Sequence, residues 1–189
     1  MNGFSCTGID VSPEVLARAR RFIEAVKAFD DGFPSIELLQ GDFMTQDLSD
    51  CVSRYDLVFN VGVIEHYLKE SERREFLRRK LALCKSGGYI VSVVPSGVHP
   101  YREEQKQEGW GGYNVPEVDY SPELLATEMR EVGAQRVMVL PHNAFGYLLT
   151  RSPKRRWFRY VGLQLLTPLL PLRVMCRCAY SFIAIGQKQ

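Results

Sequence analysis

The feature that most constrains the fold is a continuous apolar run, Leu57-Val58-Phe59, inside the stretch YDLVFNVGVIEHY at 55–67. Continuous apolar runs are typical of parallel strands that are covered on both faces. Helical patterns separate this run from other short apolar runs along the chain. Strands are therefore expected at 5–10, at 35–42, within 55–67, and at 88–96, 135–141 and 179–186. Strands that alternate with helices predict an α/β fold with a mostly parallel sheet and helices on both faces.

Two Ser-Pro-Glu triplets, at 12–14 and 121–123, mark helix starts, because serine caps a helix and proline fits its first turn. The length of 189 residues suits one domain, so we expect 1–189 to form a single domain.

Two insertions interrupt the alternation of strands and helices. The range 97–120 is rich in Gly, Tyr, Trp and charge and is expected to be a lid-like loop. The range 142–178 is both basic and apolar.

Candidate ligand-binding residues follow the predicted strands, because open parallel sheets bind ligands at the carboxyl ends of their strands. A carboxylate such as Asp10 is chemically suited to accept hydrogen bonds from the two ribose hydroxyls of a nucleoside. Asp42 is suited to an adenine amino group, and Phe43 to covering the base. Each signal is weak alone, since an acid after a strand is often only a loop or capping residue.

Taken in order, four segments resemble the class I S-adenosylmethionine-dependent methyltransferases of the small-molecule type. They are GIDVSPEVLARAR, LLQGDF, YDLVFNVGVIEHY and KSGGYIVSVVPS. The resemblance covers most of 4–141 and then 179–188. It implies a Rossmann-like fold with an antiparallel final strand. It also implies methyl transfer from S-adenosylmethionine to a small molecule.

The resemblance also implies a role for particular residues. The ribose would be bound at Asp10 and Val11, the adenine at 41–43, and the methionine side of the cofactor at Asn60 and Val61. His66 would face the substrate and is the candidate general base, since its ordinary pKa lies near neutrality; the alternative is that it only packs or caps. The predicted site residues are Asp10, Val11, Gly41, Asp42, Phe43, Asn60, Val61 and His66, with His99 and Tyr113 of the 97–120 loop as substrate contacts. No metal site is expected, because the histidines and acids are not at ligand spacing.

One departure from the family concerns the start of the chain. The family begins with a strand, a glycine-rich loop and a helix before the ribose acid, whereas nine residues precede Asp10. The resemblance therefore predicts an N-terminally incomplete sheet, and we expect a truncated form of a longer protein. The alternative is a non-catalytic, methyltransferase-like scaffold or partner subunit. A nicotinamide-dependent oxidoreductase is disfavoured, because the chain has neither Tyr-x-x-x-Lys nor G-x-G-x-x-G.

Charge is unevenly distributed along the chain. The segment 133–189 holds nine Lys/Arg residues and no acid; because the whole chain carries +2, the first 132 residues carry −7. Within this tail, RSPKRRWFRYVGLQLLTPLLPL at 151–172 joins basic and aromatic residues to an apolar run. This composition predicts an anionic membrane surface as a partner, and a lipophilic substrate. The alternative is an insertion that packs its leucines on the domain. A nucleic acid partner fits the Leu/Pro-rich continuation less well.

The five cysteines are scattered and form no C-x-x-C pair, which predicts reduced thiols. The first 20 residues have no basic segment followed by an apolar run, so no signal peptide is predicted. We therefore expect a cytoplasmic protein, with peripheral membrane association as the alternative.

Overall fold

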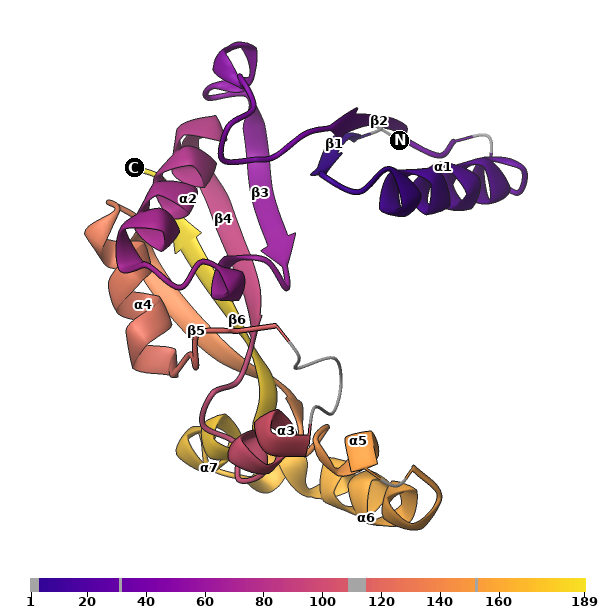
Figure 1. The fold of residues 1–189 in the computed structure, drawn as a ribbon, viewed down its shortest axis with the longest axis vertical. Coiled ribbons are helices and arrows are strands. Elements are labelled where there is room, and N and C mark those ends of the chain that lie inside the picture. Colours follow the sequence, from indigo (N-terminus) through magenta and orange to yellow (C-terminus); the bar gives the residue numbers. More distant parts are fainter. Residues whose placement is uncertain (1–3, 31, 109–114, 152) are drawn as a thin grey trace. The chain divides into compact units, whose positions relative to one another are not determined.

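The computed structural model describes residues 4–30, 32–108, 115–151 and 153–189 (Figure 1). Residue contacts divide the chain into two compact units, Met1–Leu48 (unit 1) and Ser49–Gln189 (unit 2). Each unit has its own sheet, with two strands in unit 1 and four in unit 2. The two units are described separately below.

Unit 1 is a β-α-β unit made of β1 (Ser5–Asp10), α1 (Pro13–Lys27) and β2 (Ser35–Gln40). The two strands pair in parallel. Helix α1 begins at the predicted place, because the Ser12 hydroxyl accepts a hydrogen bond from the Val15 backbone N–H at 3.2 Å. Leu16 is the one fully buried side chain in the described part of this unit.

Unit 2 is built on a sheet with the strand order β3-β4-β6-β5. Strands β3 and β4 pair in parallel, and β6 runs antiparallel to both of its neighbours. The predicted α/β fold with an antiparallel final strand is thereby confirmed. The elements of this unit are η1 (Ser49–Cys51), β3 (Tyr55–Val61), η2 (Ile64–His66), α2 (Glu70–Leu83), β4 (Cys84–Pro95), α3 (Arg102–Glu108), α4 (Pro122–Glu131), β5 (Gln135–Ala144), α5 (Leu148–Arg151), α6 (Pro153–Leu166), η4 (Thr167–Leu169), α7 (Leu172–Cys178) and β6 (Ala179–Gln187).

Helices α2 and α4 cover one face of this four-stranded sheet (Figure 1). Beneath them lies the core, where Leu77, Ile90, Met129 and Phe182 are fully buried. A buried ion pair joins the two helices. Arg73 of α2 donates two hydrogen bonds to Oε1 of Glu128 on α4, at 2.9 and 2.7 Å.

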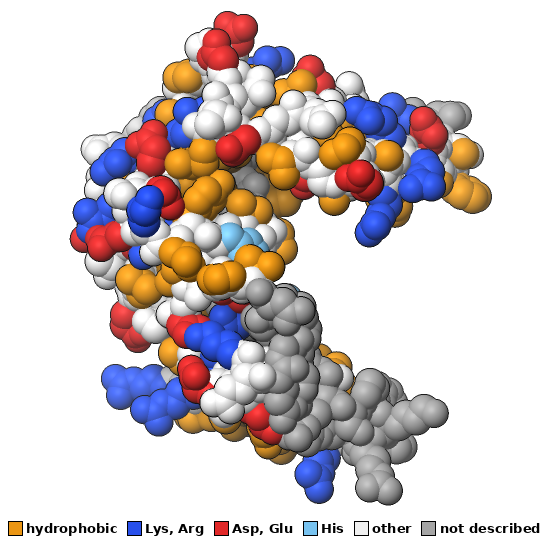
Figure 2. All heavy atoms as spheres, in the orientation of Figure 1, with side chains coloured by type: hydrophobic (Ala, Val, Ile, Leu, Met, Phe, Trp, Pro, Cys, Tyr) orange, Lys and Arg blue, Asp and Glu red, His pale blue; other side chains and the backbone are white. Residues whose placement is uncertain are grey.

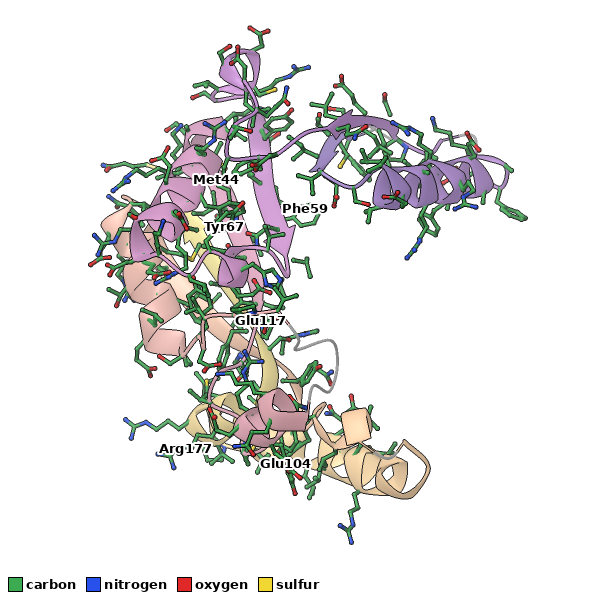
Figure 3. The ribbon with its side chains drawn as sticks, viewed as in Figure 1. Met44, Phe59, Tyr67, Glu104, Glu117 and Arg177 are labelled. Atoms are coloured by element: carbon green, nitrogen blue, oxygen red, sulfur yellow. The ribbon has the colours of Figure 1, made fainter. Side chains whose placement is uncertain are left out.

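The opposite face of the same sheet is apolar but exposed. Leu57, Phe59 and Val61 alternate along β3 and point to this face, and Tyr89 and Met138 extend it across β4 and β5. Figure 2 shows hydrophobic side chains gathered over β3, and Figure 3 shows Phe59 projecting from that strand. In the parts of unit 2 that the structure describes, β3 pairs with β4 alone, and the three β3 side chains on this face are more than half exposed.

Both predicted insertions contain helices. The 97–120 segment contains α3, and the 142–178 segment contains α5, α6, η4 and α7. These helices gather at the end of the sheet where β4 ends (Figure 1). Their packing centre is Phe145 and Tyr147, against which Tyr160, Leu163 and Leu170 lie. Periodicity did not reveal these helices, because they are short and interrupted by Pro168 and Pro171.

Candidate functional site

The carboxyl edge of the unit 1 sheet brings together the two predicted nucleoside-binding acids. Asp10 is the last residue of β1 and lies opposite Gln40, the last residue of β2. Asp42 follows β2 by two residues, and the Gly41 backbone N–H donates to the Asp10 carbonyl at 3.0 Å. Because parallel strands end at the same edge, both carboxylates lie at one side of this sheet.

Each of these carboxylates is fixed by a backbone N–H two residues further along the chain. Asp10 Oδ1 accepts a hydrogen bond from Ser12, and Asp42 Oδ1 accepts one from Met44, both at 2.8 Å. These are Asx turns, which orient a carboxylate without burying it. Among the described residues, no hydrogen bond is made to the second oxygen of either carboxylate. Each one can therefore accept hydrogen bonds from a ligand.

The neighbours of the two acids also suit a ligand edge. Val11 is exposed, and Phe43 is half-buried beside Asp42. Gly41 lies close to the Gln46 side-chain amide, which would have to move if a Cβ were added at this position. The sequence prediction thus placed these residues together correctly, while their contacts with a cofactor stay a prediction.

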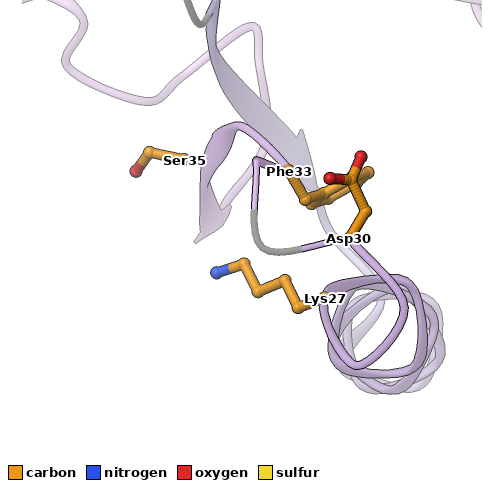
Figure 4. Close-up of a pocket in the computed structure, with 4 residues that line it drawn as sticks. All are labelled: Lys27, Asp30, Phe33 and Ser35. Atoms are coloured by element: carbon orange, nitrogen blue, oxygen red, sulfur yellow. The ribbon is translucent and has the colours of Figure 1, made fainter.

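A separate hollow lies at the other end of β2. Lys27, Asp30, Phe33 and Ser35 line it, and Figure 4 shows their side chains around it. Ser35 begins β2 and Lys27 ends α1, so the hollow lies at the amino end of this strand. It is open and shallow and contains none of the predicted site residues. We therefore do not assign it a role in catalysis.

In unit 2, the candidate site centres on the end of β3. Val61 is exposed, and the chain then turns sharply at Gly62, whose φ of +65° favours glycine. This turn leads directly into η2, which carries Glu65 and His66. Asn60 differs from its neighbours, because its side chain points to the helix-covered face and is buried.

The buried partner of Asn60 is Lys80 of α2. The Lys80 ammonium donates to Asn60 Oδ1 at 2.6 Å, to the Val91 carbonyl at 2.7 Å and to Ser92 Oγ at 2.8 Å. Burial lowers the pKa of Lys80 to about 7. The Asn60 side chain is thus buried in a hydrogen-bond network with Lys80 and Ser92. Only the Asn60 backbone remains available for the predicted contact with a cofactor.

The two residues of η2 differ sharply in exposure. His66 is exposed at the surface, as a substrate-facing residue must be, and its contact with a substrate stays a prediction. Glu65 is only 1% exposed, and within the described chain its Oε2 has no hydrogen-bond partner. Burial raises the pKa of Glu65, and the nearby Glu117 raises it further, against the lowering effect of a backbone hydrogen bond.

Glu65 is a functional candidate that the sequence prediction did not include among the site residues. A carboxyl group whose pKa is raised holds its proton more readily than an ordinary one, which is a property of a general acid. The available signal was its position three residues after the Gly62 turn, at the end of a strand. Its burial could not be read from the sequence.

His99, predicted as a substrate contact, lies in an aromatic cluster instead of at the surface. Its ring stacks on Tyr147, with centroids 5.1 Å apart and an interplanar angle of 7°. Burial lowers the pKa of His99 to about 4, the Arg102 charge lowers it further, and a hydrogen bond with Gln105 opposes the shift. The His99 imidazole is therefore neutral at physiological pH. Tyr113, the other predicted substrate contact, lies outside the described residues.

An ion-pair cluster holds the 97–120 segment in place. Arg102, whose side chain is buried, donates to Asp119 at 2.7 Å and to Glu117 at 3.0 Å. Although burial raises the pKa of Asp119, hydrogen bonds from Lys106 and Arg102 lower it below its ordinary value. Gly97 allows the two ends of the segment to touch, because a Cβ there would overlap the Asp119 backbone. Figure 3 shows Glu117 close to the carboxyl end of β3.

Over residues 4–30, 32–108, 115–151 and 153–189, no group of three or more His, Cys, Asp or Glu side chains is arranged to hold a metal ion. In the same ranges, no helix combines the length and apolar character that crossing a bilayer requires.

Comparison with known proteins gives one family match and many structural matches. Residues 1–92 match the methyltransferase domain family. No curated protein sequence matches the chain. Many solved structures have the same fold, at low sequence identity.

Three of these structures illustrate the likeness. A S-adenosylmethionine-dependent methyltransferase of Thermotoga maritima, named as a possible histamine N-methyltransferase, is 14% identical with a TM-score of 0.65, over 100% of this chain and 83% of that one. A possible exported protein of Bordetella parapertussis is 16% identical with a TM-score of 0.63, over 96% and 52%. The phosphoethanolamine N-methyltransferase 2 of Haemonchus contortus, solved with phosphomonomethylethanolamine and S-adenosylhomocysteine, is 15% identical with a TM-score of 0.60, over 96% and 43%.

At these identities the likeness establishes the fold, and it confirms the predicted Rossmann-like methyltransferase architecture. The chain spans about half the length of two of the three structures, 52% of the Bordetella protein and 43% of the Haemonchus enzyme.

Proposed function

Residues 1–92 belong to the methyltransferase domain family, and from this premise we propose that the chain transfers a methyl group from S-adenosylmethionine to a small, lipophilic molecule. One observation carries the proposal. Asp10 and Asp42 lie at the carboxyl edge of two parallel strands, and an Asx turn holds each carboxylate through its Oδ1. Among the described residues, the Oδ2 of each accepts no hydrogen bond. The Haemonchus enzyme, solved with S-adenosylhomocysteine and a small acceptor, supports the same chemistry.

The residues of unit 1 fit the nucleoside part of this cofactor. The Asp10 carboxylate accepts hydrogen bonds from the ribose hydroxyls, the Asp42 carboxylate accepts one from the adenine amino group, and Phe43 covers the base. When bound, S-adenosylmethionine supplies a methyl group that is activated by its sulfonium. The contribution of the chain is to hold the reacting groups in line, which provides much of the rate enhancement in a direct displacement.

Two residues of η2 are the candidates for proton handling in unit 2. His66 is exposed and takes the proton from an acceptor hydroxyl or amine. Glu65 lies next to it in the chain, and the His66 charge lowers the pKa of Glu65 while burial raises it. The buried Glu65 carboxyl group, whose Oε2 has no hydrogen-bond partner in the described chain, is the second candidate for accepting or releasing that proton. A pH profile of the His66→Gln variant, compared with that of Glu65→Gln, separates the two roles.

The lipophilic character of the acceptor is supported by the aromatic packing at the same end of unit 2. His99, Tyr101, Tyr147 and Tyr180 form a connected set of rings next to the carboxyl end of β4. Burial raises the pKa of Tyr147 more than any other cause does. The surroundings of the Tyr147 ring are therefore apolar. An apolar acceptor fits such surroundings better than a charged one.

Calorimetric titration with S-adenosylhomocysteine tests the proposal. The full-length protein should release or absorb heat on binding, and Asp10→Asn and Asp42→Asn should each weaken binding about ten- to a hundredfold, the effect of losing a hydrogen bond to a charged group. Asp30→Asn is the matched control. Asp30 forms the same kind of Asx turn, with Gly32 at 2.9 Å, but precedes β2 instead of following it.

Asp30→Asn should bind as the unchanged protein does. The absence of any binding heat in the full-length protein would contradict the enzymatic proposal. Equal loss in all three variants would show that the acids act through the stability of unit 1 and not through the ligand.

The second candidate is a non-catalytic, methyltransferase-like partner subunit. The exposed apolar face of β3, with Leu57, Phe59 and Val61, favours it, since such faces are typical of interfaces between subunits. Sedimentation of the purified protein tests this function. A dimer that Phe59→Lys converts to a monomer, together with no titration heat, would support the subunit role over the enzyme.

A further inference from the structure

The segment 159–177, which spans the end of α6, η4 and most of α7, has two distinct faces. On the inner face, Tyr160, Leu163 and Leu170 pack against the cluster of Ala144, Phe145 and Tyr147. The Tyr160 hydroxyl also donates to Asn143 Oδ1 at 2.9 Å. These contacts attach the segment to unit 2 and satisfy the expectation that some of its leucines pack on the domain.

The outer face of the segment exposes a second set of apolar side chains. Leu165 is 76% exposed and Leu169 is 79% exposed. Leu166, Leu172 and Val174 are also exposed and continue the same stretch of chain. Single exposed leucines are ordinary on a protein surface, but a group within ten consecutive positions marks an interaction surface.

Positive charge surrounds these exposed leucines. Arg159, Arg173 and Arg177 are exposed, and no Asp or Glu follows Glu131 anywhere in the chain. Arg177 extends outward from α7 in Figure 3, and basic side chains project from this end of the molecule in Figure 2. The segment itself contains no acid, so the arginines exceed the acidic groups there, although the pKa of the Cys176 thiol is raised by burial and also by the nearby Glu123 of α4.

Short, interrupted helices suit a position along a membrane surface. Helix α6 ends at Leu166, η4 contains Pro168, and α7 starts after Pro171. Segments that lie in a membrane interface place their leucines at the level of the acyl chains and their arginines at the level of the headgroups.

We propose that this surface, made of Leu165, Leu166, Leu169, Leu172, Arg173 and Arg177, binds the face of an anionic lipid bilayer. Nucleic acid has no use for exposed leucines, and a protein interface of this kind does not require an excess of positive charge. The surface lies on the helical group at the carboxyl end of β4, the end to which the candidate acceptor site belongs (Figure 1). Membrane attachment is independent of methyl transfer, so its test does not depend on cofactor binding.

Flotation with lipid vesicles tests the proposal. The full chain is mixed with vesicles of phosphatidylcholine, with or without phosphatidylserine, and centrifuged through a sucrose gradient. We expect flotation with the anionic vesicles and little with the neutral ones, and we expect added salt to weaken it. Leu165→Glu with Leu169→Glu, and separately Arg173→Glu with Arg177→Glu, should each weaken binding about tenfold or more.

Phe29→Glu is the matched control, because Phe29 is 93% exposed but lies at the end of α1, far along the chain from this surface. It should float as the unchanged protein does. The leucine and arginine changes are at exposed positions, so circular dichroism should show an intact fold. Equal flotation of all variants, or no flotation of the unchanged chain, overturns the proposal. A change of oligomeric state by Leu165→Glu without vesicle binding also overturns it, in favour of a protein partner.

Discussion

Unit 1 and unit 2 each carry candidate functional residues, and the two units are stabilised in different ways. In the described residues, Leu16 is the one fully buried side chain of unit 1, and its acids are held by local turns. Unit 2 has an extensive buried core and two buried polar networks, around Lys80 and around Glu128. The nucleoside-binding candidates therefore depend on local structure, whereas the acceptor-side candidates depend on tertiary packing.

The largest expected effect comes from the buried ion pair of unit 2. Arg73→Met leaves the Glu128 carboxylate buried with only the Tyr120 hydroxyl, which donates to it at 2.8 Å. Breaking a buried pair costs about 3–5 kcal/mol of the free energy of unfolding. Urea unfolding followed by circular dichroism measures the loss, and hydrogen exchange should confine it to unit 2.

Arg74→Met is the control for this prediction. Arg74 lies on the same helix and pairs with Glu131 at 2.8 Å, but both side chains are partly exposed. Its removal should cost less than about 1 kcal/mol. Similar losses for both variants would show that burial of the Arg73–Glu128 pair is not what stabilises unit 2.

Matched leucine truncations compare the two cores directly. Leu77→Ala in unit 2 should lower the free energy of unfolding by about 2–5 kcal/mol, since it opens a cavity in a packed core. Leu16→Ala should increase hydrogen exchange throughout unit 1 and leave unit 2 protected. Exchange that rises in both units for either variant would contradict the separation and show one cooperative fold.

Lys80 should make the stability of unit 2 depend on pH. Its pKa is about 7 in the folded protein against 10.5 for an ordinary lysine, so between these values the unfolded chain binds more protons. The free energy of unfolding should therefore rise with pH across this window, by at most about 1.4 kcal/mol per pH unit, and Lys80 should contribute no slope below pH 7. Urea titrations at a series of pH values measure the slope.

Lys80→Met should remove this slope, whereas Lys85→Met should keep it. Lys85 is a partly exposed lysine that pairs with Asp56 at 2.8 Å. A slope that persists in Lys80→Met would assign the pH dependence to another group.

The smallest effects compare the two Ser-Pro-Glu helix starts. Ser12 and Ser121 make equivalent caps, each accepting from a backbone N–H at 3.2 Å. Ser→Ala at either position should cost about 1 kcal/mol. Because unit 1 has so little core, Ser12→Ala should increase exchange across that unit, while Ser121→Ala should change only the first turn of α4. If both variants increased hydrogen exchange only in the first turn of their own helix, the two units would not differ in how much their stability depends on the cap.

Most of the fold could be predicted from the sequence, because its strands and caps are local signals. The Ser12 and Ser121 caps begin helices at the predicted positions, and the apolar run at 57–59 lies in β3. The helices within 97–120 and 142–178 were missed, because their stability comes from contacts such as those of Tyr160 and Arg102 with distant residues.

The candidate site divides in the same way. Asp10 and Asp42 could be placed at one edge from sequence, because parallel strands align their carboxyl ends and Asx turns are local. The burial of Glu65, of His99 and of the Asn60 side chain could not, because each depends on residues more than ten positions away, such as Lys80 and Tyr147.

By itself, then, the sequence determined the order of the strands, the starts of α1 and α4, the two acids at the strand ends and the uneven charge. Hydrophobic periodicity, turn chemistry and charge are properties of neighbouring residues. Only the tertiary structure decided which side chains are buried and which leucines of 159–177 remain exposed. The physical reason is that burial depends on which distant segments pack together, and packing is what shifts the pKa of Lys80, Glu65 and His99.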